Sequence, residues 1–490
     1  MGFPLPKYFM TSALVTDFYE LTMMQGYFLQ KHNPLVVFDM FYRNNPFQGG
    51  YSIFTGVEEL LNKLENLSFS EDDIAYLRGL NMFDESFIDY LSTYRFSGDV
   101  YTFDEGTPAF PGEPLIRVET HLIDAQLIES LLLNTVNFQT LIATKASRMV
   151  LATKGHGAIM EFGLRRAQGE DGAHAAARAS FVGGTKVTSD TYAGKKYGIP
   201  VAGTMAHSWI MSFSSELEAF RKFAELYPNN CILLIDTYDT LGSGIDAAIQ
   251  VGLEMKKKGK KIGVRIDSGD LNYLTKAIRE KLDNAGLTDA TICVSNDLTE
   301  EIILTLVNDG APIDSWGIGT HLVTGGTQSS LNGVYKLAAK EENGVFTPTL
   351  KVSNSYEKTT NPGIKQVYRF FDKNGSALGD LITLADEDMN ENRNYTFYHP
   401  FSTQDFFVMK KQNYARVEPL LKKKIENGKR LYKELPLAEI QKNSAELLSH
   451  FDKSYKRLIN PHIYKVSLSE KLRNLKTDLI LETKKKENKI

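Results

Sequence analysis

The sequence predicts an α/β protein, with an irregular (incomplete) TIM-like α/β barrel, an N-terminal α+β domain and a small C-terminal region of strands and helices. Short apolar runs that end in polar or glycine-rich residues recur from about residue 155, and a helical segment follows most of them. This rhythm is typical of βα units, which build parallel sheets and barrels. The rhythm is absent earlier in the chain and stops after about residue 345. We therefore expect domains over residues 1–150, 151–340 and 341–490, with C-terminal segments completing the first.

The N-terminal domain mixes helical and strand patterns. Apolar residues recur at helical spacing in "DFYELTMMQGYFLQK", whereas "LVVFDMFYR" reads as a strand that ends at "NNPFQGGY". Glycine and proline break a β-type segment into hairpins, and a long apolar helix follows it. The expected elements are a strand over 35–43, helices over 57–64 and 71–95, hairpins over 99–120 and a helix over 121–150.

The barrel strands are expected where the short apolar runs lie. In such barrels the polar residues at the carboxyl ends of the strands make the active site, so the ends of these runs give the candidate residues. The runs are "GAIMEFG" (157–163), "IPVAGT" (199–204), "CILLID" (231–236), "KIGVRID" (261–267), "TICVSND" (291–297) and "SWGIGT" (315–320).

The C-terminal region has a different pattern. Strand-like pieces flank Asn374-Gly375, a pair typical of a hairpin turn. The residues beyond about 430 read as helical and end in "LETKKKENKI", which we interpret as a solvated tail.

Composition narrows the function classes. Of 490 residues, 56 are Lys or Arg and 60 are Asp or Glu, and this net charge of −4 does not favour a nucleic-acid binder. The two cysteines, Cys231 and Cys293, lie in apolar runs and are expected to be buried thiols. Polar residues interrupt the apolar stretch 125–144, which predicts a buried helix and not a membrane span. We expect a cytoplasmic protein that binds neither nucleic acid nor membrane.

Charged residues at two strand ends suggest an anion and metal site. Arg265 and Asp267 are two apart on a strand, so their side chains share a face. They form either a structural ion pair or an anion-binding arginine beside an acid that orients a hydroxyl or a metal-bound water. Asp236 ends the preceding run in the same way, which favours the functional reading. Carboxylates beside a phosphate site suit Mg²⁺.

Two further strand ends carry groups suited to a flat, phosphorylated ligand. "GIGTHLVTGGT" (317–327) has glycines that let the backbone approach an anion. "MEFGLRRAQG" (160–169) places an aromatic ring beside two arginines; Phe162 could stack on a heterocycle or belong to the core. Arg166 could clamp phosphate or form a surface salt bridge.

His207 follows the run "IPVAGT" in a stretch of small residues. A lone histidine is usually structural, but the small neighbours Gly203 and Ala206 favour access to it. Neutral imidazole is a competent nucleophile, so a covalent intermediate is one possible use.

Several longer stretches show that the chain resembles nicotinate phosphoribosyltransferases, a family of type II phosphoribosyltransferases. The resemblance runs nearly from end to end. The matching stretches are "TDFYELTM", "RNNPFQGGYSIFTG", "NFQTLIATKASR", "EFGLRRAQ", "GTMAHSW", "LIDTYDT", "VRIDSGDL", "SNDL", "GIGTHLVT", "LNGVYKL" and "EKTTNPGIKQVYR".

The resemblance implies a reaction and its partners. Nicotinate and phosphoribosyl pyrophosphate would give nicotinate mononucleotide and pyrophosphate in NAD biosynthesis, with Mg²⁺ and with ATP hydrolysis coupled through a phosphohistidine. It also implies a homodimer with shared active sites, since the N-terminal segment of such enzymes reaches the neighbouring subunit's site.

The resemblance also implies a role for each matching residue. His207 would be phosphorylated, and Asp267 and Asp236 would serve ribose or Mg²⁺. Tyr19, Phe162, Arg165, Thr204, Arg265 and Thr320 would bind substrate, and Gly317, Gly319 and Thr320 would bind phosphate.

The choice of substrate rests on one departure from the family pattern. Related enzymes tend to carry an acid near Lys186, which in nicotinamide-specific relatives helps hold the amide. A lysine there suits a carboxylate and favours nicotinate. The alternatives are nicotinamide or quinolinate as substrate, a non-catalytic sensor of phosphorylated metabolites, and a phosphosugar isomerase or aldolase.

Overall fold

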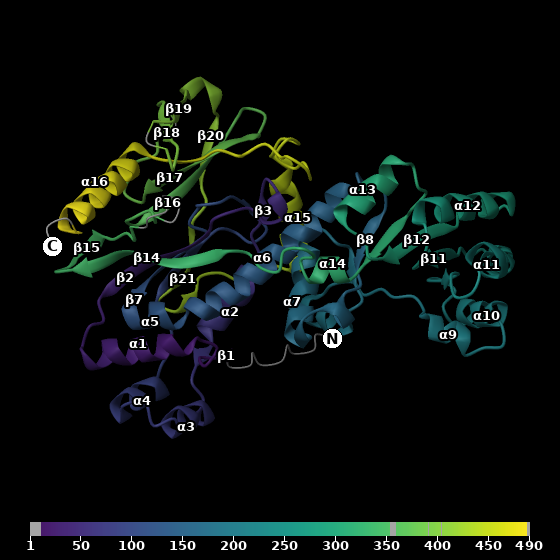
Figure 1. Ribbon diagram of the computed structural model, residues 1–490, viewed down its shortest axis with the longest axis horizontal. Coiled ribbons are helices and arrows are strands. Elements are labelled where there is room, and N and C mark those ends of the chain that lie inside the picture. The colour runs from purple at the N-terminus through teal and green to yellow at the C-terminus, as the bar shows by residue number, and fades with distance from the viewer. Residues whose placement is uncertain (1–10, 353–358, 391, 403, 488–490) are drawn as a thin grey trace. The chain divides into compact units, whose positions relative to one another are not determined.

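The computed structural model describes residues 11–352, 359–390, 392–402 and 404–487. The chain divides into two compact units (Figure 1). The first comprises residues 1–140, 330–435 and 446–490, and the second comprises residues 141–329 and 436–445. No helix in the described ranges is long and apolar enough to cross a membrane. The expected tail reaches past these ranges, since residues 488–490 lie outside them.

A seven-stranded sheet organises the N-terminal part of the first unit, in the order β15-β14-β2-β7-β5-β21-β22. Its strands are β2 (Leu35–Tyr42), β5 (Asp99–Thr102), β7 (Ile116–His121), β14 (Gly333–Glu342), β15 (Val345–Pro348), β21 (Lys422–Glu426) and β22 (Lys429–Arg430). Strand β2 is central because almost all of its side chains are apolar and buried. The expected strand over 35–43 and the hairpin segment over 99–120 are confirmed, since β5 pairs antiparallel with β7.

Helices cover this sheet. Helix α1 packs on α5, which packs on β7 and β2 (Figure 1). The helices of this part are α1 (Phe18–Leu29), α2 (Val57–Glu65), α3 (Glu71–Gly79), α4 (Glu85–Ser92), α5 (Leu122–Leu127) and the first half of α6 (Glu129–Ala152), whose residues from 141 onwards belong to the second unit. They confirm the helices expected over 57–64, 71–95 and 121–150, with breaks at the α3–α4 and α5–α6 junctions. Two small ladders, β1 (Thr11–Ser12) with β4 (Leu67–Ser68) and β3 (Ser52–Ile53) with β6 (Pro108–Ala109), complete this part.

A six-stranded sheet forms the C-terminal part of the first unit, in the order β19-β18-β23-β17-β16-β20. Its strands are β16 (Lys365–Phe371), β17 (Ala377–Leu384), β18 (Tyr395–Tyr398), β19 (Phe406–Met409), β20 (Arg416–Pro419) and β23 (Val466–Leu468). The expected hairpin is present, because β16 and β17 pair antiparallel and Gly375 has the positive φ of 82° that its turn requires. The end of the chain is helical in part, as α15 (Leu437–Ser449) and α16 (Glu470–Glu487).

The second unit contains a parallel sheet in the order β10-β11-β12-β13-β8-β9. Its strands are β8 (Ala158–Glu161), β9 (Val187–Thr188), β10 (Ile232–Leu234), β11 (Gly263–Ile266), β12 (Thr291–Asn296) and β13 (Ser315–Ile318). Five of the six runs expected to be strands are strands here. The sixth run, 199–204, forms only a bridge between Val201 and Thr188.

The expected barrel is not confirmed. Among the described residues the strand pairing leaves β10 and β9 at opposite edges, so the sheet is open and no ring of strands closes. The βα rhythm specifies parallel neighbours but not whether the first and last strands pair, and that pairing decides closure. The protein is a mixed α/β protein in which the active-site rule for barrels still applies to strand ends, because parallel strands share one carboxyl edge.

Helices connect the parallel strands of the second unit. They are α7 (Gly169–Val182), α8 (Thr191–Tyr197), α9 (His207–Met211), α10 (Glu216–Leu226), α11 (Ile245–Lys257), α12 (Leu271–Asn284), α13 (Glu300–Asn308) and α14 (Thr320–Val323). Helix α11 packs against both α10 and α12 (Figure 1). The strands between them are apolar and buried, for example at Val264, Ile292 and Trp316. Both cysteines are buried, as expected, and burial raises the pKa of Cys231 to about 11.

Candidate active site at the carboxyl ends of the parallel strands

Arg265 of β11 is the centre of a polar cluster in the second unit. Its Nε donates to Ser295 Oγ at 2.8 Å, its Nη1 to Thr204 Oγ1 at 2.9 Å and its Nη2 to Asp267 Oδ1 at 3.1 Å. The predicted pair of Arg265 and Asp267 is therefore an ion pair, and Thr204 belongs to the same cluster. Because only 12% of the arginine side chain is exposed, its hydrogen bonds lie in a partly desolvated environment where they are strong.

The ring of Phe162, which follows β8, lies near this arginine. The guanidinium carbon of Arg265 is 5.8 Å from the ring centre. A Cβ atom at Gly317 of β13 would come within 2.7 Å of the ring, so the absence of a side chain there lets the ring lie over the strand. Phe162 is half-buried, so stacking on a ligand stays a prediction.

Asp236, two residues after the end of β10, is the buried acid of the cluster. Its Oδ2 accepts from the Asp267 N–H and from Ser268 Oγ, both at 2.7 Å. Its Oδ1 is buried and has no hydrogen-bond partner among the described residues. A buried carboxylate oxygen without a partner is costly, and it is the kind of atom that a bound cation or a proton donor would satisfy.

His207 is the first residue of α9, and its imidazole faces the same strand end. The Nε2 atom lies 3.9 Å from Asp236 Oδ1, and Nδ1 lies 3.1 Å from Thr237 Oγ1. The side chain is 40% exposed, so both a partner and solvent can reach it. The contact with Thr237 leaves Nε2 as the nitrogen directed towards Asp236.

Gly319 connects β13 to the short helix α14, of which Thr320 is the first residue. Gly319 precedes the helix, and the Leu322 and Val323 N–H groups donate to its carbonyl. A Cβ atom at Gly319 would lie 3.1 Å from the Phe162 carbonyl oxygen. The predicted phosphate loop therefore adjoins the segment that carries the aromatic ring.

The other predicted residues lie on other elements. Arg165 and Arg166 lie on an exposed 3-10 turn (Leu164–Arg166), and within the described ranges neither forms an ion pair. Lys186 is exposed just before β9. Tyr19 lies on α1 in the first unit, with its side chain half exposed.

Several polar residues of the cluster were not singled out from the sequence. Ser295 bonds both Arg265 and Asp267, and Thr237 bonds His207. Both follow apolar runs, so the strand-end rule that selected their neighbours could have found them.

A metal could be held only by a small protein ligand set. In the described part of the chain no group of three or more His, Cys, Asp or Glu side chains is arranged to bind a metal ion. Asp236 and Asp267 are adjacent, however, and Asp236 has an unused oxygen. Mg²⁺ keeps most of its water and needs one or two carboxylates together with substrate phosphates, so this pair fits it.

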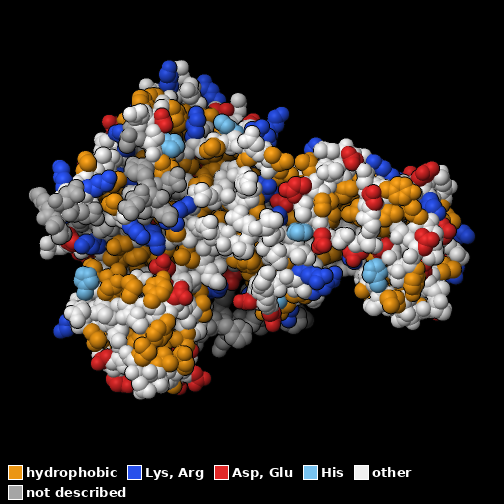
Figure 2. Space-filling model, in the orientation of Figure 1, with side chains coloured by type: hydrophobic (Ala, Val, Ile, Leu, Met, Phe, Trp, Pro, Cys, Tyr) orange, Lys and Arg blue, Asp and Glu red, His pale blue; other side chains and the backbone are white. Residues whose placement is uncertain are grey.

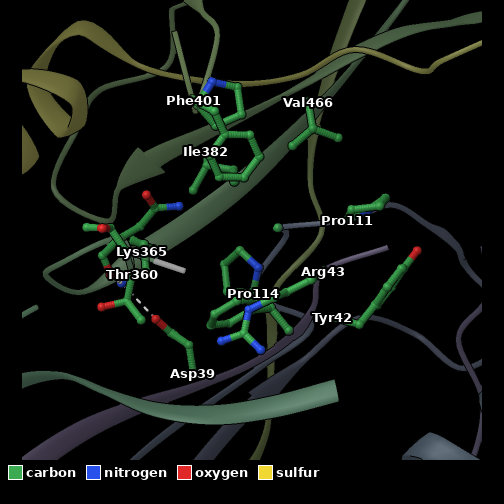
Figure 3. A pocket seen from close by; sticks show the side chains of 15 residues that line it. Asp39, Tyr42, Arg43, Pro111, Pro114, Thr360, Lys365, Ile382, Phe401 and Val466 are labelled. Carbon is green, nitrogen blue, oxygen red and sulfur yellow. Dashed lines mark hydrogen bonds and ion pairs between the residues drawn. The ribbon is translucent and has the colours of Figure 1, made fainter. Parts of the chain in front are cut away.

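The first unit contains a pocket of its own, between β2 and the segment 359–365 (Figure 3). At one side Lys365 Nζ lies 2.7 Å from Asp39 Oδ2, and burial lowers the pKa of Lys365 and raises that of Asp39. Arg43 lies beside them, with its Nε buried and unbonded among the described residues. No role was predicted from the sequence for any of these three residues. On the face shown in Figure 2, acidic and basic side chains are interspersed, which agrees with the small net charge.

Family models match three stretches of the chain. The N-terminal domain of nicotinate phosphoribosyltransferase matches residues 14–137, the nicotinate phosphoribosyltransferase family matches residues 158–383, and the C-terminal domain of that enzyme matches residues 364–476.

Relatives and solved structures agree with these matches. A nicotinate phosphoribosyltransferase of Bacillus subtilis is 41% identical over 474 residues, covering 96% of each chain. One from Caenorhabditis elegans is 35% identical, covering 94% of this chain and 92% of its own. The crystal structure of human nicotinic acid phosphoribosyltransferase is 30% identical with a TM-score of 0.83, covering 95% of this chain and 99% of that one. A Pyrococcus furiosus nicotinate-nucleotide pyrophosphorylase (22% identity, TM-score 0.69, covering 91% and 98%) is alike in fold.

The fold is that of an α/β enzyme, and its candidate site is the polar cluster at the carboxyl edge of the parallel sheet. The chain belongs to the nicotinate phosphoribosyltransferase family, because the identity extends over nearly all of it and of its relatives.

Proposed function

We propose that the protein transfers the phosphoribosyl group of phosphoribosyl pyrophosphate to nicotinate, giving nicotinate mononucleotide and pyrophosphate for NAD biosynthesis in the cytoplasm. The observation that carries the proposal is the convergence of Arg265, Phe162 and His207 with two acids at one sheet edge. This set offers a cation for a carboxylate, a face for a flat ring and a nucleophile beside a metal site.

Arg265 and Phe162 would bind nicotinate. The guanidinium would hold the carboxylate of nicotinate, with Thr204 and Ser295 fixing its orientation through the bonds described above. The pyridine ring would stack on Phe162. Because the ring nitrogen of nicotinate is a weak nucleophile, holding it against C1 of the ribose matters more than base catalysis.

The loop from Gly317 to Thr320 would receive the ribose phosphate, and Arg165 would assist from its exposed turn. Tyr19 would complete the site of the neighbouring subunit in a homodimer, which its exposure permits.

Asp236 and Asp267 would hold Mg²⁺, and the buried Oδ1 of Asp236 has no hydrogen-bond partner among the described residues. When bound, the ion supplies positive charge that stabilises the departing pyrophosphate. Asp267 also keeps Arg265 in place, so its carboxylate serves both sites.

His207 would couple ATP hydrolysis to the transfer. With Nδ1–H donating to Thr237 Oγ1, the lone pair of Nε2 is free to attack the γ-phosphorus of ATP. A bond from Nε2 to phosphorus forms as the bond to the ADP oxygen breaks, and water later cleaves the phosphoryl group from Nε2. The phosphoryl charge beside the acids would organise the metal and pyrophosphate.

The test follows His207 and product formation separately. After incubation with ATP and Mg²⁺, mass analysis should find an acid-labile phosphate on His207 of the wild type. The His207→Ala variant should lose ATP turnover that depends on substrate while retaining some nucleotide formation. If ATP hydrolysis stays coupled to product in this variant, the role of His207 is wrong. The choice of substrate is tested by supplying labelled phosphoribosyl pyrophosphate with nicotinate, nicotinamide or quinolinate in turn. A preference for nicotinate would agree with the role expected of Lys186. Binding of these compounds without turnover would indicate a sensor and not an enzyme.

A further inference from the structure

A network of buried hydrogen bonds adjoins Phe162 and involves residues that have no role in the proposed reaction. It begins at Glu161, the last residue of β8, which is 1% exposed. Two groups donate to its carboxylate: the Gly163 backbone N–H and, at 2.5 Å, Thr188 Oγ1 on the adjacent strand β9. Glu161 therefore ties the residue that follows Phe162 to the edge of the sheet.

In this network the neighbouring groups determine which atom donates and which accepts each hydrogen bond. Thr188 Oγ1 accepts from the Asp190 N–H at 3.0 Å, so its own proton is left for Glu161. Asp190 is 1% exposed and caps α8 by accepting from the Ala193 N–H. Its other oxygen lies 2.6 Å from His174 Nδ1, which must carry the proton because a carboxylate only accepts.

The segment of Phe162 is held on its opposite side by β13 and α14. The Phe162 N–H donates to the Ile318 carbonyl at 2.8 Å. A Cβ atom at Gly163 would come within 2.2 Å of a methyl group of Val323, so this segment is already in close contact with α14. The Phe162 ring can therefore shift easily only if the hydrogen bonds of Glu161 to Gly163 and Thr188 are lost.

Burial makes the Glu161 bonds costly to lose. Desolvation raises the pKa of Glu161, while the bonds from Thr188 and Gly163 act in the opposite direction by stabilising the carboxylate. If Thr188 lost its hydroxyl, Glu161 would have to find another donor or turn, and Gly163 would lose its anchor.

We propose that Glu161 and Thr188 are positioning residues for the pyridine ring of the substrate, acting through the Phe162–Gly163 segment, and that Asp190 and His174 hold Thr188 in place. The inference rests on the proposed function in one respect, namely that Phe162 is the surface on which the ring stacks. Neither Glu161 nor Thr188 touches the substrate. Each affects the affinity for the pyridine ring and does not affect the binding of the phosphate groups.

Thr188 offers a matched set of variants for the test. Thr188→Val keeps the shape of the side chain and its preference for a strand but removes both hydrogen bonds, whereas Thr188→Ser keeps the hydroxyl. The control is Thr275→Val on α12, a buried threonine of the same unit whose Oγ1 donates only to backbone carbonyls one turn earlier. The KM of nicotinate and that of phosphoribosyl pyrophosphate are measured separately, with kcat.

We expect Thr188→Val to raise the KM of nicotinate about tenfold, which corresponds to about 1.4 kcal/mol of lost binding. The KM of phosphoribosyl pyrophosphate and kcat should stay within about threefold, and Thr188→Ser and Thr275→Val should resemble the wild type. If Thr188→Val raises both KM values alike, or matches Thr275→Val, the positioning role is refuted. Should Thr188→Val fail to fold, Glu161→Gln gives the same readout, because glutamine has one acceptor oxygen and cannot replace the two carboxylate oxygens that accept from Gly163 and Thr188.

The two proposals fail in different ways. If the wild type releases no pyrophosphate in response to nicotinate, the proposed function is wrong. If the wild type is active on nicotinate and Thr188→Val leaves its KM unchanged, only the positioning role is wrong.

Discussion

The stability of the first unit should depend on pH through Glu20, a buried acid in the segment that carries Tyr19. Glu20 lies on α1 and is 0% exposed. Thr16 Oγ1 and Ser130 Oγ donate to its carboxyl group, the latter at 3.0 Å. Burial, which outweighs these hydrogen bonds, raises the pKa of Glu20 from 4.5 to about 7, and the nearby acids Glu129 and Asp17 add to the rise.

The sign and size of the effect follow from this pKa. Between pH 4.5 and about 7 the folded protein retains a proton that the unfolded chain has released, so the free energy of unfolding falls as the pH rises and levels off above pH 7. At about 1.4 kcal/mol for each pH unit, the total loss is about 3 kcal/mol. Tyr19 does not titrate in this range, since burial and these acids raise its pKa to about 12.

The perturbation that isolates this effect is Glu20→Gln, which keeps the volume and hydrogen-bonding capacity but cannot ionise. Urea unfolding of wild type and variant is followed by circular dichroism from pH 5 to pH 8. The variant should gain stability relative to the wild type as the pH rises, by about 2–3 kcal/mol across this range. Asp17, Glu129 and Lys336, which pairs with Glu129, are unchanged and cancel in the difference. Parallel pH profiles for the two proteins would refute the reasoning.

Three further substitutions test the site and the fold. Arg265→Lys removes the planar fork and should lower kcat/KM for nicotinate about 100-fold with little change in melting temperature; near-normal kinetics would show that a point charge suffices. Gly317→Ala places a methyl group 2.7 Å from the Phe162 ring and should raise the KM of nicotinate severalfold. The same clash should lower the free energy of unfolding by about 1–2 kcal/mol. An unchanged KM would show that nicotinate does not bind against this ring. Arg369 and Asp380 form a buried ion pair, with Nη2 of Arg369 2.6 Å from Oδ2 of Asp380. Asp380→Asn removes the charged partner of Arg369 and should lower the free energy of unfolding, measured by urea titration, by about 3–5 kcal/mol. A loss below about 1 kcal/mol would contradict this interpretation.

Much of the local structure was predictable from the sequence because local spacing determines it. Helices α2 and α3, strand β2 and the turn at Gly375 each follow from periodicity or turn chemistry within a few residues. The same strand-end rule selected Arg265, Asp267 and Asp236, which the structure brings together.

The remaining features depended on contacts between distant segments. The strand-end rule can place Thr204 and Ser295 at the same sheet edge as Arg265, but it does not show which hydrogen bonds form between residues that lie 61 and 30 positions from the arginine. Thr188 was missed because its strand, β9, is too short to show a period.

By itself, the sequence determined the βα rhythm, the strand-end acids and the family to which the chain belongs, because these properties reside in local patterns and in motifs. Only the tertiary structure decided that the parallel sheet stays open, that Asp236 retains an unbonded oxygen facing His207, and that Glu161 anchors the aromatic segment. The physical reason is the same in each case: strand partners and buried hydrogen bonds are set by packing between segments far apart in the chain, and no local spacing encodes which of them will meet.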